Sequence, residues 1–194
     1  MDRNNLALQA AQAVDADELV RLTQTLIRIA SYYPGPGEQP VVDFLEPYLR
    51  ERGFKTTVQE VVPGRPNLIA DLGQGEGGLI LEGHTDVVTH GSLDQWTIPP
   101  YEARIVDGKI YGRGACDMKG GLAAAICAAV AVQKVLGPPH KTLRLCIPCD
   151  EEGLMIGIKA FIRAGYAEGF AGAIICEPEE NQVCLWQKGA MRVW

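Results

Sequence analysis

Segments with the apolar pattern of β-strands alternate with helical segments along this chain, and this alternation limits the folds that it can adopt. Strands are expected at residues 54–62, 66–73, 78–86, 141–148 and 170–177. Helices are expected at residues 15–30, 40–53, 120–137 and 157–169, with a hairpin around Asp107-Gly108 within 101–114. This order is typical of an α/β fold with a mostly parallel central sheet flanked by helices. In such sheets, ligands bind at the carboxyl ends of the strands.

The composition is that of one globular domain, and it argues against several classes of partner. The 194 residues are 47% hydrophobic and carry a formal net charge of −6, without a dense block of Lys or Arg. Nucleic acids and anionic membranes are therefore poor partners. No apolar run approaches the ~20 residues that cross a bilayer, and residues 1–20 lack the features of a secretory signal. We expect a cytoplasmic protein.

Six cysteines lie in the second half of the chain, and most are expected to be buried thiols. Only Cys146 and Cys149 have C-x-x-C spacing, and an alternating strand would not direct both side chains to one point. Thiols in a reducing compartment are favoured over disulfides, with a zinc–thiolate site as the weaker alternative.

Acidic and imidazole side chains follow the apolar segments. They are His84, Asp86, Asp117, the run Asp150 to Glu152, and Glu177. Because the ends of parallel strands share one edge of a sheet, these side chains are expected to converge. One histidine among several carboxylates is repulsive without a cation, whereas such a mixed nitrogen and oxygen set suits zinc, cobalt or manganese. Alternatively, the acids are solvated or cap helices, as Asp150 could for the helix after it.

Four sequence motifs together resemble the M20 family of zinc-dependent metallopeptidases and amidohydrolases, of the acetylornithine deacetylase and succinyl-diaminopimelate desuccinylase type. They are GHTDVV at 83–88, GRGACDMKGG at 112–121, DEEG at 150–153 and CEPE at 176–179. Their order and spacing fit the family over residues 79–189. The resemblance implies a zinc-exopeptidase-like catalytic domain.

The resemblance also implies a metal centre with two zinc ions, for which cobalt or manganese could substitute. Asp117 resembles the carboxylate that bridges both ions, His84 and Glu177 resemble the other ligands of the first ion, and Glu152 resembles a ligand of the second. A cis peptide between Asp117 and Met118 is implied as well.

Two further acids resemble catalytic residues of the family. Glu151 resembles the general base that takes a proton from the attacking water, and Asp86 resembles the partner that orients the imidazole of His84. Neighbouring side chains diverge, so Glu152 can face a metal while Glu151 faces the substrate.

The implied function is metal-dependent hydrolysis of an amide bond, in an N-acyl amino acid or a small peptide, by a water activated between two metals. The glutamate at position 177 favours the deacylases of the family over its peptidases. The alternative is a truncated fragment of such an enzyme that binds metal or a partner without catalysis.

The resemblance covers only the N-terminal part of a catalytic domain, over residues 1–194. Neither His90 nor His140 matches the distal histidine ligand of the family. The resemblance implies that the lid and dimerisation domain and the C-terminal part of the catalytic domain lie outside residues 1–194, so a homodimer is expected of the full-length protein only.

Overall fold

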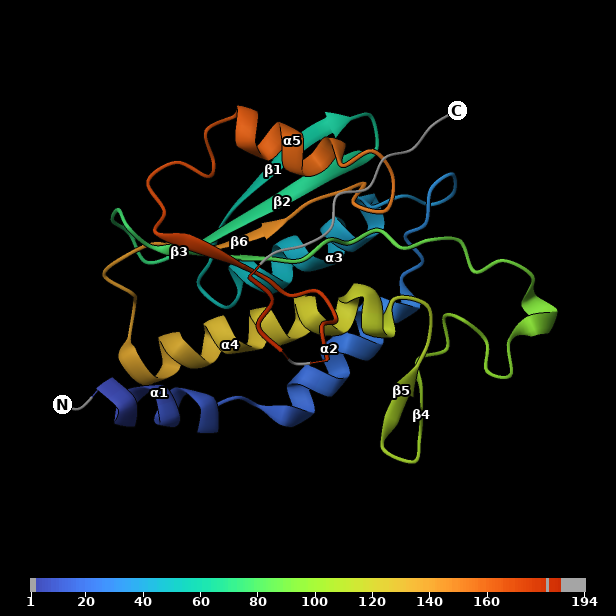
Figure 1. Cartoon of the computed structure of the whole chain (residues 1–194), viewed down its shortest axis with the longest axis horizontal. Coiled ribbons are helices and arrows are strands. Elements are labelled where there is room, and N and C mark those ends of the chain that lie inside the picture. The colour runs from blue at the N-terminus through green and yellow to red at the C-terminus, as the bar shows by residue number, and fades with distance from the viewer. Residues whose placement is uncertain (1–2, 181, 186–194) are drawn as a thin grey trace.

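A central sheet with strand order β1-β2-β6-β3-β7 organises the fold (Figure 1). The structure is a computed structural model that describes residues 3–180 and 182–185. The strands of the sheet are β1 (Lys55–Val62), β2 (Arg65–Leu72), β3 (Leu79–Glu82), β6 (Leu143–Ile147) and β7 (Gly172–Ile175). A separate hairpin consists of β4 (Arg104–Val106) and β5 (Lys109–Tyr111). All of these strands lie within or close to the predicted segments.

The sheet is mixed, so the predicted parallel arrangement holds for only part of it. Strand β3 pairs in parallel with β6 and β7, whereas β2 runs antiparallel to both β1 and β6. Only Pro63 and Gly64 separate β1 from β2, and so short a connection permits only antiparallel pairing. The α/β class is confirmed, and the three parallel strands β6, β3 and β7 deliver their carboxyl ends to one edge.

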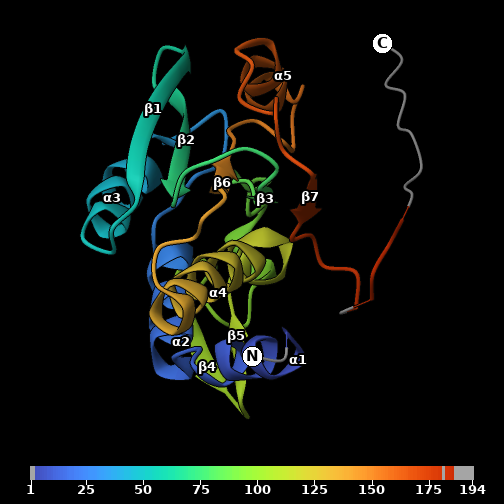
Figure 2. The same ribbon diagram turned by 90° about the vertical axis from the view of Figure 1, so that its left-hand side faces the viewer.

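Helices cover both faces of the sheet (Figures 1 and 2). They are α1 (Arg3–Gln12), α2 (Ala16–Arg28), α3 (Gln39–Arg50), α4 (Gly120–Leu136) and α5 (Ile156–Arg163). Side chains alternate along β2, where Leu68 and Ala70 join the core beneath α2, α3 and α4, and Ile69 joins a smaller cluster with Phe161 of α5. The larger core therefore lies on one face of the sheet, and α5 closes the other.

Helix α4 is apolar because it lies between the sheet and other helices. It contacts α1 and α2 on one side and β3 and β6 on the other. The helical stretch Ala115–Leu136 is long and apolar enough to cross a membrane by length and composition alone, so the expectation that no run reaches this length is wrong. Half of its most apolar 18-residue window is buried within the fold, which accounts for the composition.

Helix α1 is absent from the sequence expectations. Its residues show little separation of polar from apolar faces, which is the pattern that predicts a helix. It contacts α4 in the folded chain, so tertiary packing supports it.

The cysteines are all free thiols, and half of them fit the expectation of burial. Cys127, Cys146 and Cys149 are buried, whereas Cys176 is partly exposed. The remaining two, Cys116 and Cys184, are exposed. Burial raises the pKa of Cys146 and Cys149, which keeps these thiols protonated and unreactive.

Gly121 allows α4 to approach the end of β7. A Cβ atom at this position would overlap the backbone carbonyl oxygen of Cys176, beside Glu177. We expect Gly121→Ala to lower the free energy of unfolding by about 1–3 kcal/mol, because a close-packed contact cannot absorb a methyl group. Chemical denaturation measures this loss. Gly172→Ala is the matched control, since its Cβ would meet nothing closer than 3.9 Å; equal losses for the two variants would contradict this account.

Candidate metal centre

His84 lies at the centre of the predicted site and is fully buried. Sheet-like hydrogen bonds continue past the end of β3, with the N–H of Gly83 donating to Cys146 and that of Thr85 donating to Pro148. The Nδ1 atom of His84 lies 2.9 Å from the backbone oxygen of Asp86. A carbonyl can only accept a hydrogen bond, so Nδ1 carries the proton and Nε2 faces the other way.

Four carboxylates gather around the Nε2 side of His84. Nε2 lies 3.2 Å from Asp117, 3.4 Å from Glu177 and 3.8 Å from Glu151. The potential ligand atoms form two groups, His84 with Glu151 and Glu177, and His84 with Asp117 and Glu152, and within each group all atoms lie within 4.8 Å of one another. The structure therefore brings the five residues together, from segments up to about half the chain apart in sequence.

The two adjacent glutamates fall into different groups. Glu152 shares a group with Asp117, and Glu151 shares one with Glu177. Both are close enough to bind a cation, so the division between Glu152 as ligand and Glu151 as base stays a prediction.

Asp117 lies between the hairpin and α4, as expected from the sequence, but the hairpin is not part of the central sheet. It follows the hairpin strand β5 and lies in the segment Ala115–Lys119 that leads into α4. Its backbone is extended within this segment, with φ −115° and ψ 101°. The cis peptide between Asp117 and Met118 is confirmed. The side chain is 54% exposed, the most open of those around His84.

Asp86 is buried and connects the histidine loop to both glutamates. One carboxylate oxygen accepts the N–H of Glu151 and the other accepts the N–H of Glu152, each at 3.0 Å. The nearer of these oxygens is also 3.5 Å from Nδ1 of His84, farther than the backbone oxygen. Burial raises the pKa of Asp86, but His84 and the two amides outweigh it and hold the pKa below its ordinary value. Asp86 is thus a fixed anion.

The field of the site is strongly negative. Burial, followed by neighbouring acids, raises the pKa of Glu151 and Glu152. Burial lowers the pKa of His84, yet Asp86 and Glu177 together raise it to about 11. The ion pairs of Asp117, Glu151 and Glu177 among the described residues all go to His84. A divalent cation fits this donor set, since it would balance charges that the neighbouring protein does not.

Glu82 is an additional acid that the sequence interpretation overlooked. It ends β3, is buried, and has its pKa raised to about 7, chiefly by burial. Its position as an acid at the end of the apolar run LILE was the available signal. Together with Glu151 and Glu177 it lines a cleft of about 240 Å³, whose other walls include Met155 and Ile158.

Lys119, two residues after Asp117, binds backbone oxygens. Lys119 is fully buried, and its Nζ donates to the backbone oxygens of Leu26 and Ile29 at 2.9 and 2.7 Å. Burial lowers its pKa to about 7. Lys119 therefore anchors the end of α2 to the segment that carries Asp117.

Asp150, the first acid of the DEEG run, turns away from the metal centre. It pairs with Arg65 at 2.7 Å and also accepts the N–H of Ile156, the first residue of α5, at 3.3 Å. The helix-capping alternative is therefore partly realised for Asp150, while the two glutamates after it point into the centre.

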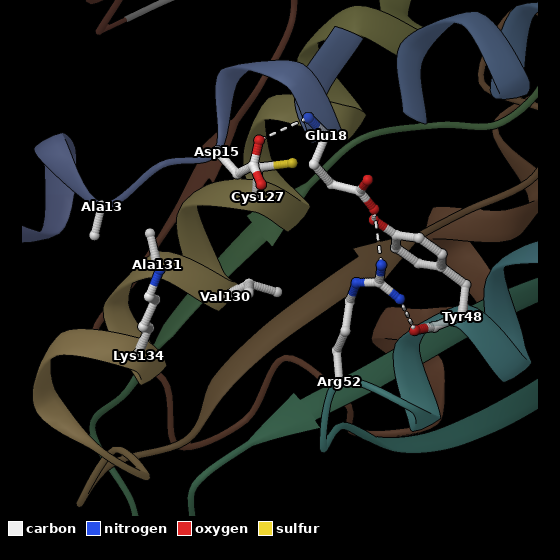
Figure 3. Close-up of a pocket in the computed structure, with 9 residues that line it drawn as sticks. All are labelled: Ala13, Asp15, Glu18, Tyr48, Arg52, Cys127, Val130, Ala131 and Lys134. Atoms are coloured by element: carbon white, nitrogen blue, oxygen red, sulfur yellow. Dashed lines mark hydrogen bonds and ion pairs between the residues drawn. The ribbon is translucent and has the colours of Figure 1, made fainter. Parts of the chain in front are cut away.

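A separate cleft of about 320 Å³ lies between α2, α3 and α4 (Figure 3). Its acid Glu18 accepts from Tyr48 at 2.6 Å and from Arg52 at 2.7 Å, and its second oxygen accepts from Arg21. These charges are satisfied by one another, so the network is a structural link between α2 and α3.

Comparison with known proteins identifies the family. The pattern of peptidase family M20/M25/M40 matches residues 80–185. A probable succinyl-diaminopimelate desuccinylase of Staphylococcus epidermidis is 34% identical over 172 residues, which are 89% of this chain and 42% of that protein. The succinyl-diaminopimelate desuccinylase of Rhodospirillum centenum is 39% identical over 144 residues, which are 71% of this chain and 36% of that protein.

Solved structures share the fold. Human carnosine dipeptidase 1 is 23% identical with a TM-score of 0.70, and the match covers 89% of this chain and 40% of that protein. The dipeptidase Dug1p of Saccharomyces cerevisiae is 18% identical with a TM-score of 0.73, and the match covers 87% of this chain and 40% of that protein. The chain thus spans about two fifths of the length of these relatives. Since the family pattern matches more than half of its residues, the chain belongs to peptidase family M20/M25/M40.

Proposed function

We propose that this chain carries most of a two-metal centre that hydrolyses an amide bond in an N-acyl amino acid or a small peptide. The observation that carries the proposal is the buried His84, whose Nε2 atom lies within 3.8 Å of the carboxylates of Asp117, Glu151 and Glu177 and shares a ligand group with Glu152. A Bacillus subtilis protein of similar fold is described as a dinuclear metal-binding peptidase of the M20 family, and this supports the proposal.

The proposed ligands divide between two positions. His84 and Glu177 would hold one ion, Glu152 would hold the other, and Asp117 would serve as a ligand to both. Zinc is the proposed metal, with cobalt or manganese as substitutes, because imidazole and carboxylate donors suit all three. A metal bound there would supply an activated water, by lowering its pKa from 15.7 toward ~7, and a Lewis acid for the amide carbonyl.

The remaining residues transfer the proton and orient the proposed ligands. Glu151 accepts a proton from the attacking water and returns it to the leaving amine, and its raised pKa suits both steps. Asp86 holds the tautomer of His84 through its backbone oxygen, and its carboxylate binds the backbone N–H groups of both glutamates. The cleft beside Glu151 is mainly apolar at Met155 and Ile158, and would receive the carbon chain next to the scissile bond.

The proposed substrate class is an N-acyl amino acid. The two desuccinylases, at 34% and 39% identity, support this choice over a dipeptide. We further propose that residues 1–194 are the N-terminal part of a catalytic domain, and that a lid and dimerisation domain belongs to the part of the relatives that this chain does not match. A cytoplasmic location remains a prediction from composition.

A non-catalytic fragment is the second candidate, favoured by the coverage of only 42% of the Staphylococcus epidermidis relative. Calorimetric titration of this chain with Zn²⁺ and Co²⁺ tests the metal centre. Turnover of N-succinyl and N-acetyl amino acids and of unblocked dipeptides, by a longer chain with the C-terminal segments of its relatives, tests catalysis. Metal binding without any hydrolysis by the longer chain would favour the fragment, and preference for dipeptides would overturn the substrate class.

A further inference from the structure

A buried ion network lies directly behind the two glutamates of the metal centre. Arg65 of β2 pairs with Glu38, at the start of α3, through Nε at 2.9 Å and through a second short contact from Nη2. Its Nη1 atom pairs with Asp150 at 2.7 Å. All three residues are at most 7% exposed, so one buried guanidinium pairs with two buried carboxylates.

This network holds a backbone turn, because its members also bind main-chain groups. Glu38 accepts the N–H of Asp150 at 3.1 Å, and Asp150 accepts the N–H groups of Leu154 and Ile156 at 2.9 and 3.3 Å. Glu38 occupies the position that would cap α3, yet its side chain makes no cap bond and turns to this network instead. Glu38 therefore stabilises this turn rather than the start of α3.

Three consecutive amides of this turn are bound by buried carboxylates. Glu38 accepts the N–H of Asp150, and Asp86 accepts those of Glu151 and Glu152. Asp150 and Met155, which bracket the turn, both adopt left-handed backbone angles, with φ of 61° and 55°. Residues with a Cβ rarely adopt this conformation without support from their surroundings. The side-chain contacts supply that support.

We propose that Arg65 and Glu38 are positioning residues for the metal centre, acting through Asp150 on the backbone that carries Glu151 and Glu152. The argument rests on the proposed function only for what the two glutamates do. Arg65 binds the side chain of Asp150, at the start of the turn, while Asp86 binds the backbone of Glu151 and Glu152 from the side of His84.

Two variants separate positioning from simple loss of stability. Arg65→Met leaves Glu38 and Asp150 unpaired and is expected to destabilise the fold. The triple variant Arg65→Met, Glu38→Gln, Asp150→Asn removes the stranded charges at nearly constant size, and is expected to recover stability but not the positioning. Arg144→Met with Asp71→Asn is the matched control. It removes a paired guanidinium and carboxylate, at 2.6–2.7 Å, that link β2 to β6 near the start of β6, away from the site.

The readouts are amide hydrogen exchange at Glu151 and Glu152 in the metal-free protein, and the affinity and visible absorption spectrum of bound Co²⁺. In the triple variant we expect faster exchange at both amides, an altered cobalt spectrum and affinity reduced by a factor on the order of 10–100, the usual cost of losing support behind a ligand. The control is expected to keep the exchange rates, spectrum and affinity of the parent.

A folded triple variant with parental exchange and cobalt affinity would overturn the inference, and if Arg65→Met does not fold, the triple variant decides alone. Failure of the parent chain to bind Co²⁺ would refute the proposed function instead. In that case, the exchange rates at Glu151 and Glu152 still test the positioning.

Discussion

Replacing Asp117 by alanine is expected to remove nearly all bound metal from both positions of the centre. Asp117 lies 3.2 Å from Nε2 of His84, a proposed ligand of the first ion, and shares a ligand group with Glu152, the proposed ligand of the second. Its loss would delete two coordination bonds and leave the other acids facing one another without compensation. Elemental analysis of the purified variant measures the metal-to-protein ratio, in the longer chain that includes the distal ligand of the relatives.

Glu152→Ala is the matched comparison for this effect. It removes one ligand of the second position and should spare the first, which His84, Asp117 and Glu177 would still hold. We expect about half of the metal to remain, as against almost none in Asp117→Ala. A full metal complement in Asp117→Ala would exclude the bridging role, and the acids of the DEEG run would then need another explanation, such as solvation.

Replacing Glu151 by glutamine should separate catalysis from metal binding. Glutamine keeps the size of the side chain and removes its ability to take a proton. Turnover of an N-acyl amino acid by the longer chain is expected to fall by a factor on the order of 10²–10⁴, the usual contribution of a positioned general base. Metal content, measured in the same preparation, should change little.

The geometry makes this a demanding test, because Glu151 lies only 3.8 Å from Nε2 of His84 and shares a group with Glu177. Glu152→Gln serves as the control, with loss of metal from the second position expected alongside loss of turnover. Parallel loss of metal and turnover in Glu151→Gln would make Glu151 a ligand, and the assignment of the two glutamates would have to be revised.

Much of the fold could be predicted from local patterns. Strand β6 is an apolar run, and α2 repeats its apolar residues at helical spacing, with Leu22 and Leu26 both buried. Helix α1 was missed because its sequence has no such pattern, and only its contact with α4 supports it. The antiparallel pairing of β2 with β6 was also missed, because strand order and direction depend on segments about 75 residues apart.

Most residues of the candidate site could be predicted from the sequence, but the way in which the fold brings them together could not. The acids after β6 and β7 and the histidine after β3 were recognisable, since parallel strands present their carboxyl ends together. That Asp117 approaches from the start of α4, and that Glu82 adds to the negative field, depends on how α4 and the hairpin fold against the sheet.

The sequence by itself determined the α/β class, the family and most of the residues that converge, because these depend on residue type and on spacing within short segments. The tertiary structure alone decided that Asp150 pairs with Arg65 rather than with a metal, and that Asp86 and Glu38 bind three consecutive amides of the turn. The physical reason is desolvation. Once these carboxylates are buried, each needs a hydrogen-bond donor. Several of their donors lie 60 or more residues away in the chain, so these pairings cannot be predicted from the local sequence.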